Sequence, residues 1–175
     1  MEAIVIPKLD AARRQLEMAV ELFFEKRDPV AIHTLCCAAY DIIDGVCQDR
    51  GGIEVFCKRR YTTKPGALRR ADINAPQNFF KHADDDPKSS LEFYPEMTEP
   101  LMADACRTFM ELTGESVTPF ICFVWWFKCR DGEDGFECSA EHKGLLKDLL
   151  VLFARDDRAA FLARLAEGGN HAMVD

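Results

Sequence analysis

The chain has 175 residues, which suits one domain over 1–175 and leaves little room for a second. Hydrophobic residues make up 48% of it and charged residues 30%, a balance that argues against global disorder. The formal net charge of −8 argues against broad, nonspecific binding of nucleic acid, because an acidic surface repels phosphate groups.

Two helices joined by a very short connection open the chain. Apolar residues recurring at spacings of three and four predict a helix over 7–27 and another over 29–50. Asp28 is suited to cap the second helix, Pro29 to begin it and Gly51 to end it. So short a connection predicts that the two helices pack side by side as an antiparallel hairpin.

Leu16 and Leu35 stand in the apolar stripes of these two helices. We expect both side chains to be largely buried between the helices.

No uninterrupted apolar run in the chain reaches the roughly 20 residues that cross a bilayer. The most apolar stretch, 119–127, is less than half that length, so the sequence predicts no association with a membrane.

The middle of the chain contains a shorter predicted helix. Residues 61–74 are basic and include a Pro-Gly turn signal, which predicts irregular structure. Asn74, followed by Pro76, is suited to cap a short helix that contains residues 77–83. The acidic residues and the proline of 84–87 are expected to close this helix.

Four further helices are predicted in the second half of the chain. Thr98 is suited to cap a helix that Gly114 ends. The strongly apolar stretch 120–129 favours a helix over a strand, and apolar patterns over 140–154 and 157–167 predict the last two helices. The elements together predict an all-α fold, a helical bundle built on the N-terminal antiparallel hairpin.

The chain contains eight cysteines and no Cys-x-x-Cys pair. The sequence predicts no signal peptide at its N-terminus, and several cysteines stand in apolar helical stripes, where a free thiol behaves as a small hydrophobic group. We therefore expect all eight to be reduced, in a cytoplasmic protein. Cys129, Cys138 and His142 flank an acidic loop and offer an alternative as zinc ligands, although they lack the usual close ligand pair.

The short middle helix carries residue types suited to catalysis or binding. Asn78 and His82 are four residues apart, so on a helix they share a face. Phe79 and Phe80 predict burial that would fix the orientation of the imidazole, as a general acid or base requires. Asp84 follows closely enough to orient the ring or to raise its pKa. A structural role, in which Asn78 and His82 bridge neighbouring loops through hydrogen bonds, is the alternative.

The densest basic stretch of the sequence precedes this helix. A local basic patch could bind RNA despite the acidic balance of the chain, and the alternative is a solvated loop that serves solubility. The stretch consists of Lys58, Arg59, Arg60, Lys64, Arg69 and Arg70.

The opening hairpin and the later Asn-x-x-x-His segment resemble the HEPN superfamily. That resemblance implies a small helical bundle, often dimeric, of the kind found among bacterial toxins, defence proteins and RNA-processing factors. In its active members an Arg-Asn-x-x-x-His type motif cleaves RNA without a metal. Here Asn78 and His82 match the motif, whereas Gln77 stands at the arginine position and cannot stabilise the charge that develops on the phosphate. Lys81 and the last two arginines of the basic stretch are the nearby cations.

The resemblance covers the hairpin and the short helix, about half of the chain. It implies a binding or interaction module, with RNA or a partner protein as its target and a homodimer as its expected assembly. If the chain cleaves RNA, His82 is the expected acid or base, Asn78 positions it or the phosphate, and Lys81 is the nearest cation. The change at Gln77 makes binding the more expected activity. Segment 78–84 also resembles bacterial proteins of unknown function, which implies no activity.

A second interpretation places the chemistry inside the bundle. His33, Tyr40 and Asp44 fall near one face of the second helix, and Glu21 stands on the first. With His82, these residues predict a small helical enzyme or a metal-binding protein as the alternative function. The helices lack the Glu-x-x-His pairs of di-metal bundles, so a partly buried His33 bonded to a neighbouring helix is the simpler interpretation. We expect no bound cofactor, because the sequence lacks a phosphate-binding glycine loop.

Overall fold

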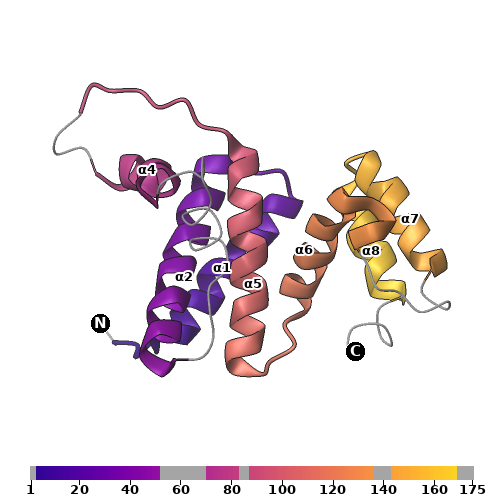
Figure 1. Cartoon of the computed structure of the whole chain (residues 1–175), viewed down its shortest axis with the longest axis horizontal. Coiled ribbons are helices and arrows are strands. Elements are labelled where there is room, and N and C mark those ends of the chain that lie inside the picture. The colour runs from indigo at the N-terminus through magenta and orange to yellow at the C-terminus, as the bar shows by residue number, and fades with distance from the viewer. Residues whose placement is uncertain (1–2, 52–69, 83–86, 136–142, 169–175) are drawn as a thin grey trace.

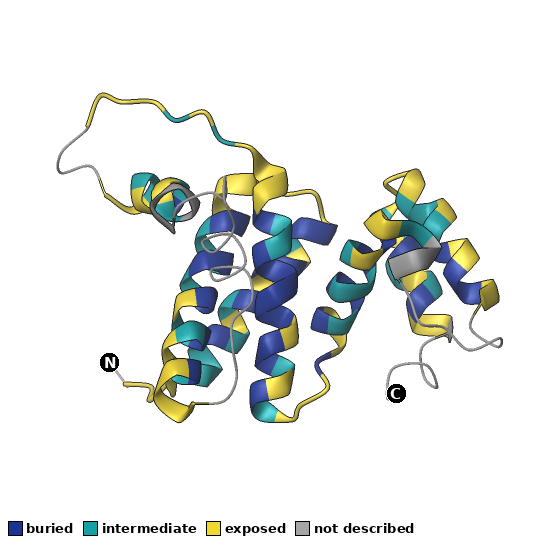
Figure 2. Ribbon diagram, in the orientation of Figure 1, coloured by how far each residue is buried: buried dark blue, intermediate teal, exposed yellow. Residues whose placement is uncertain are grey.

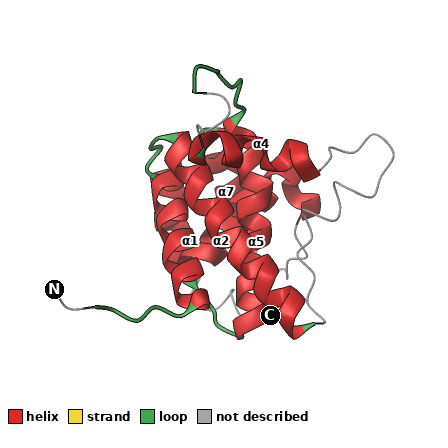
Figure 3. Ribbon diagram, turned by 90° about the vertical axis from the view of Figure 1, so that its left-hand side faces the viewer, coloured by secondary structure: helices red, strands yellow, loops and turns green. Residues whose placement is uncertain are grey.

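The computed structural model describes residues 3–51, 70–82, 87–135 and 143–168. All regular elements in these residues are helices, which confirms the predicted all-α fold (Figures 1 and 3). The α-helices are α1 (Lys8–Phe24), α2 (Pro29–Arg50), α4 (Arg70–Lys81), α5 (Thr98–Thr113), α6 (Thr118–Lys128), α7 (Lys143–Ala154) and α8 (Arg158–Gly168). Two 3-10 helices, η1 (Pro95–Met97) and η2 (Cys129–Gly135), complete the set.

α1 and α2 form the predicted antiparallel hairpin (Figure 1). The Asp28 carboxylate accepts hydrogen bonds from the backbone N–H groups of Val30, at 2.9 Å, and Ala31, at 3.1 Å, and so caps α2 as predicted. Leu16 is fully buried, which confirms its prediction. Leu35 is less enclosed than Leu16 and packs against the core from its edge, in agreement with its prediction.

The core lies between α1, α2 and α5, whose buried residues face one another (Figure 2). α6, which the sequence predicted as a helix, packs against α5 and α1. Buried apolar side chains form one continuous cluster from α1 to α8. The bundle that starts with the hairpin is therefore completed by helices from the second half of the chain.

Trp126 of α6 connects the helices on its two sides. Its ring lies 6.1 Å from that of Phe23 in α1, measured between centroids, and 4.9 Å from that of Phe153 in α7. The Phe161 ring of α8 lies 5.0 Å away. Edge-to-face contacts between aromatic rings stabilise a fold by more than the burial of their surface area alone. The contacts of Trp126 therefore stabilise the packing of the pair α7–α8 against the bundle.

The ends of α1 and α7 are tied together. Lys26 and Asp156 follow these helices in the left-handed conformation, with φ of 55° and 50°, and each turn has the two hydrogen bonds of a Schellman motif. Lys26 Nζ donates to the Asp156 carboxylate at 2.6 Å and to its backbone oxygen at 2.8 Å. The neighbouring Arg158 side chain donates to the backbone oxygen of Phe23. These contacts hold the α7–α8 pair against the end of α1.

Two helix starts differ from their predictions. α4 begins at Arg70, so Asn74 and Pro76 lie inside the helix and Asn74 is not its cap. Proline favours the first turn of a helix, which is why the sequence predicted a start there. Thr98 is not a cap either, because α5 continues directly from η1 and the Thr98 hydroxyl is bonded to His33.

Among the described helices, α2 is long and apolar enough to cross a membrane, by length and composition only. The helix has 22 residues and contains a window of mean hydropathy 1.4, which corrects the expectation that no stretch is long enough. Core helices of soluble proteins pass the same test, and 44% of that window is buried inside the protein. The packing of α2 against α1 and α5 accounts for its apolar character.

Six of the eight cysteines lie in the described residues, and all six are buried: Cys36, Cys37, Cys47, Cys106, Cys122 and Cys129. Burial raises the pKa of Cys122 to about 11 and that of Cys129 to about 12. Both are therefore neutral thiols at pH 7. Cys57, Cys138 and His142 lie outside the described residues.

We expect all eight cysteines to be reduced in the native protein. Alkylation of the denatured, unreduced chain should add eight labels, as counted by mass spectrometry. In the folded protein the six buried thiols should react much more slowly, because they are shielded from the reagent and Cys122 and Cys129 are not thiolates. Recovery of a chain with six or fewer labels would contradict this prediction, because each disulfide removes two labels.

Candidate functional site

α4 is anchored to the hairpin through Gln77. Only 5% of Gln77 is exposed, and its side-chain Nε2 donates a hydrogen bond of 2.7 Å to Oδ2 of Asp41 in α2. A hydrogen bond from a neutral amide to a carboxylate is stronger than one between neutral groups. Gln77, which the sequence placed among the binding residues, therefore faces the protein and fixes the position of α4.

Asn78 lies on the outside of this anchored helix, and His82 directly follows its last residue, Lys81. Both are exposed, and the backbone N–H of His82 donates to the backbone oxygen of Asn78 at 3.0 Å, so the two residues are one turn apart. Within the part of the chain that the structure describes, neither side chain makes a hydrogen bond, so no structural bridge is present there. Lys81, between them, is also exposed. We call Asn78, Lys81 and His82 the outer edge of α4.

The described part of the chain does not place any of the other predicted site residues at this edge. Arg69 and Asp84 lie outside the described residues. Arg70 is the first residue of α4, at the opposite end of the helix from His82, and its side chain is not among those described. The outer edge of α4 therefore consists of three of the predicted site residues.

His33 has a different environment from His82. Only 1% of it is exposed, and its ring lies among α2, α4 and α5. Nδ1 is 2.9 Å from the Thr98 hydroxyl, and Nε2 is 3.4 Å from the Cys37 sulfur. The rings of Phe80 and Phe93 contact its imidazole edge to face, at centroid distances of 5.8 and 5.1 Å. His33 is thus enclosed, with a polar neighbour at each ring nitrogen.

The enclosure of His33 fixes its charge state. Burial lowers the pKa of the imidazole to about 4, and the positive charge of Lys81 acts in the same direction. His33 is therefore neutral at pH 7, and one of its nitrogens carries the proton while the other accepts. A neutral, enclosed imidazole of this kind is suited to hold helices together.

Within the described residues, His33, Asp44 and Glu21 do not form the metal site that the sequence offered as an alternative. Both nitrogens of His33 already have neighbours, and the Asp41 carboxylate further along the same helix accepts a hydrogen bond from Gln77. No group of three or more His, Cys, Asp or Glu side chains in the described residues could hold a metal ion. The prediction placed Asp44 and Glu21 near His33 from helical periodicity alone, and periodicity does not decide which helix covers a face.

A second buried polar group follows two turns further along α2. Tyr40 donates its hydroxyl hydrogen to Oδ2 of Asp104 at 3.0 Å, and Arg107 donates to Oδ1 of the same carboxylate at 3.1 Å. The phenol of Tyr40 and the carboxylate of Asp104 are buried, whereas Arg107 reaches the surface. These hydrogen bonds join α2 to α5 and compensate the buried charge of Asp104, as a satisfied structural network does.

The sequence analysis missed Thr98, Cys37 and Phe93 as neighbours of His33. The i,i+4 spacing of His33 and Cys37 was a readable signal, because residues at that spacing share a helix face. Thr98 lies 65 residues further along the chain, and no local pattern links it to His33.

Comparison of the chain with models of protein families, with curated proteins and with solved structures finds no match.

Proposed function

We propose that this chain is a HEPN-like binding module whose outer edge of α4 contacts RNA without cleaving it. The observation that carries the proposal is that Asn78 and His82, the two residues that match the HEPN motif, are exposed one turn apart on an anchored helix. Lys81 adds a positive charge to the same edge for contact with phosphate. As in the superfamily that it resembles, we expect a bacterial, cytoplasmic protein that forms a homodimer.

The position of Gln77 supports binding over cleavage. At the place of the motif's arginine, the Gln77 side chain points to Asp41 and not to the outer edge of α4. A cation there would be neutralised by the Asp41 carboxylate before it could stabilise a phosphate. No specific observation favours the metal-binding alternative, because the His33 and carboxylate groups in the described residues do not form a ligand set.

RNA binding should depend on the outer edge of α4. Fluorescence anisotropy with a labelled single-stranded RNA should show binding at low salt, which the double variant Asn78→Ala/His82→Ala weakens without lowering the melting temperature, since both side chains are exposed. Lys81→Ala should weaken binding and reduce the slope of log Kd against log salt by about one. Lys147→Ala, which removes an exposed cation from α7, is the matched control and should leave binding unchanged.

The proposal is wrong if the unmodified protein does not bind RNA, or if the double variant binds it equally well. An early melting transition in His82→Ala would indicate a structural role instead. Gln77→Arg is the companion variant. We expect it to yield no RNA cleavage, because its guanidinium would pair with Asp41, and cleavage by this variant would overturn the restriction to binding.

A further inference from the structure

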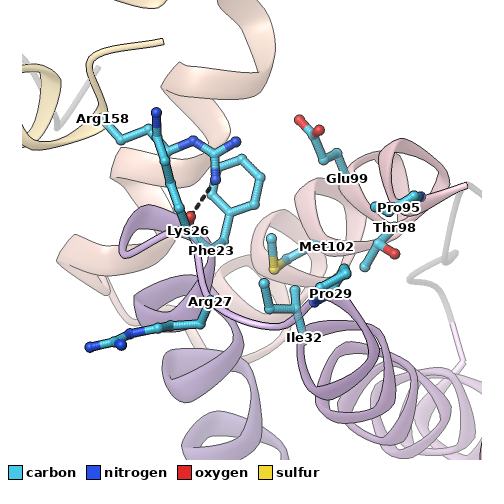
Figure 4. Close-up of a pocket in the computed structure, with 10 residues that line it drawn as sticks. All are labelled: Phe23, Lys26, Arg27, Pro29, Ile32, Pro95, Thr98, Glu99, Met102 and Arg158. Carbon is cyan, nitrogen blue, oxygen red and sulfur yellow. Dashed lines mark hydrogen bonds between the residues drawn. The ribbon is translucent and has the colours of Figure 1, made fainter.

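A cavity of about 260 Å³ opens at the turn between α1 and α2, beside the start of α5 and of α8 (Figure 4). Its wall is apolar where Phe23, Ile32 and Met102 contribute their side chains. Its rim carries the cations Lys26, Arg27 and Arg158. An apolar wall with a few charged groups is the usual composition of a small-molecule site, and such sites favour the junctions between packed units of a protein.

Arg158 is the least exposed cation of this rim. Its side chain is 18% exposed, and its guanidinium lies 3.9 Å from the centroid of the Phe23 ring. Nε donates to the Asp156 carboxylate at 2.9 Å, and Nη1 donates to the backbone oxygen of Phe23. Nη2 makes no hydrogen bond to any described residue. Two fixed nitrogens therefore hold a third donor in place, and a donor that is already ordered loses little entropy on binding.

The electrostatics of the cavity favour an anion. The first turns of α2 and α5 both line it, and the N-terminus of a helix carries a partial positive charge. Glu99 is the acidic residue of the lining, and Arg130 neutralises it through an ion pair. Burial raises the pKa of Glu99, whereas the charges of Arg130 and Arg158 act in the opposite direction. Lys26 and Arg158 share the single carboxylate of Asp156, so one of their two positive charges is left without an opposite charge.

We propose that this cavity binds a small monocarboxylate with an apolar body. The carboxylate accepts hydrogen bonds from Nη2 of Arg158 and is attracted by Lys26, and the body packs on Phe23, Ile32 and Met102. Guanidinium is suited to this contact because its donors match the geometry of a carboxylate. The volume is just below the range of roughly 300–1,000 Å³ that encloses drug-sized ligands, so the occupant is a short branched or aromatic acid.

The methyl group of Met102 gives a direct readout of binding. In protein labelled with ¹³C at the methionine methyl groups, 4-methylpentanoate should shift the Met102 signal in a saturable manner, at millimolar concentration. Met110, in the same helix but outside the cavity, is the internal control and should not shift. Two matched probes each carry one part of this ligand. The compound 4-methylpentan-1-ol has the apolar body without the charge, and acetate has the charge without the body.

Arg158→Met should weaken the binding of 4-methylpentanoate by about tenfold, the loss expected for one charge-assisted hydrogen bond. If this variant does not fold, Lys26→Met, which removes a more exposed cation, should weaken binding by a smaller factor. The proposal is overturned if 4-methylpentanoate gives no saturable shift, or if either matched probe binds as well as it does. It is also overturned if the folded variant binds with unchanged affinity.

Discussion

Leu16→Ala is expected to lower the free energy of unfolding by about 2–5 kcal/mol, the range for a core leucine. Leu16 is fully buried in α1, so truncation removes its transfer free energy and leaves a cavity that close-packed neighbours cannot fill. Leu35→Ala should cost less, because Leu35 lies at the edge of the core and water can occupy part of the vacated space. Urea unfolding followed by circular dichroism measures both differences.

Met18→Ala is the matched control for this pair, since Met18 lies on the same helix and is exposed. Its effect should stay within about half a kcal/mol. A loss below that value for Leu16→Ala would mean that the apolar stripe of α1 faces solvent or a partner. The bundle described above would then be wrong in its central contact.

The parts of the fold that the sequence predicted correctly depend on local signals. Asp28 followed by Pro29 marks a helix start because a carboxylate satisfies free N–H groups and proline needs no partner there. Gly114 ends α5 in the left-handed conformation that glycine adopts without strain. The turns at Lys26 and Asp156 have the same left-handed conformation without glycine, so no residue type in the sequence predicted them.

In the candidate site, too, features with a local sequence signal were predicted and features that depend on distant residues were not. Helical spacing alone placed Asn78 and His82 one turn apart, and the structure has them so. The inward direction of Gln77 depends on Asp41, which lies 36 residues away in the sequence and in a different helix. The enclosure of His33 depends on Thr98 and Phe93, which reach it only when the bundle is assembled. Periodicity predicts which residues share a face, and it does not predict what covers that face.

His33 is expected to make the fold sensitive to acid. Its pKa is lowered from 6.5 to about 4 in the folded protein, so the unfolded chain takes up its proton first as the pH falls. The stability that the neutral ring contributes is complete above pH 6.5 and is lost as the pH falls to about 4. A shift of this size corresponds to a loss of about 3 kcal/mol across that interval, before carboxylates add their own contributions.

The contribution of His33 can be separated from that of the carboxylates by comparing variants between pH 7 and pH 4. His33→Gln retains a polar side chain near Thr98 and cannot take up a proton, so its free energy of unfolding should fall less steeply with acid than that of the unmodified protein. Lys81→Ala should fall less steeply too, because the positive charge that opposes protonation of the ring is gone. His82→Gln is the matched control, since the exposed His82 contacts neither Thr98 nor Phe93, and it should retain the original acid sensitivity. If His33→Gln and the unmodified protein lose stability in parallel over this range, His33 is not protonated on unfolding, and the enclosed neutral ring described here is wrong.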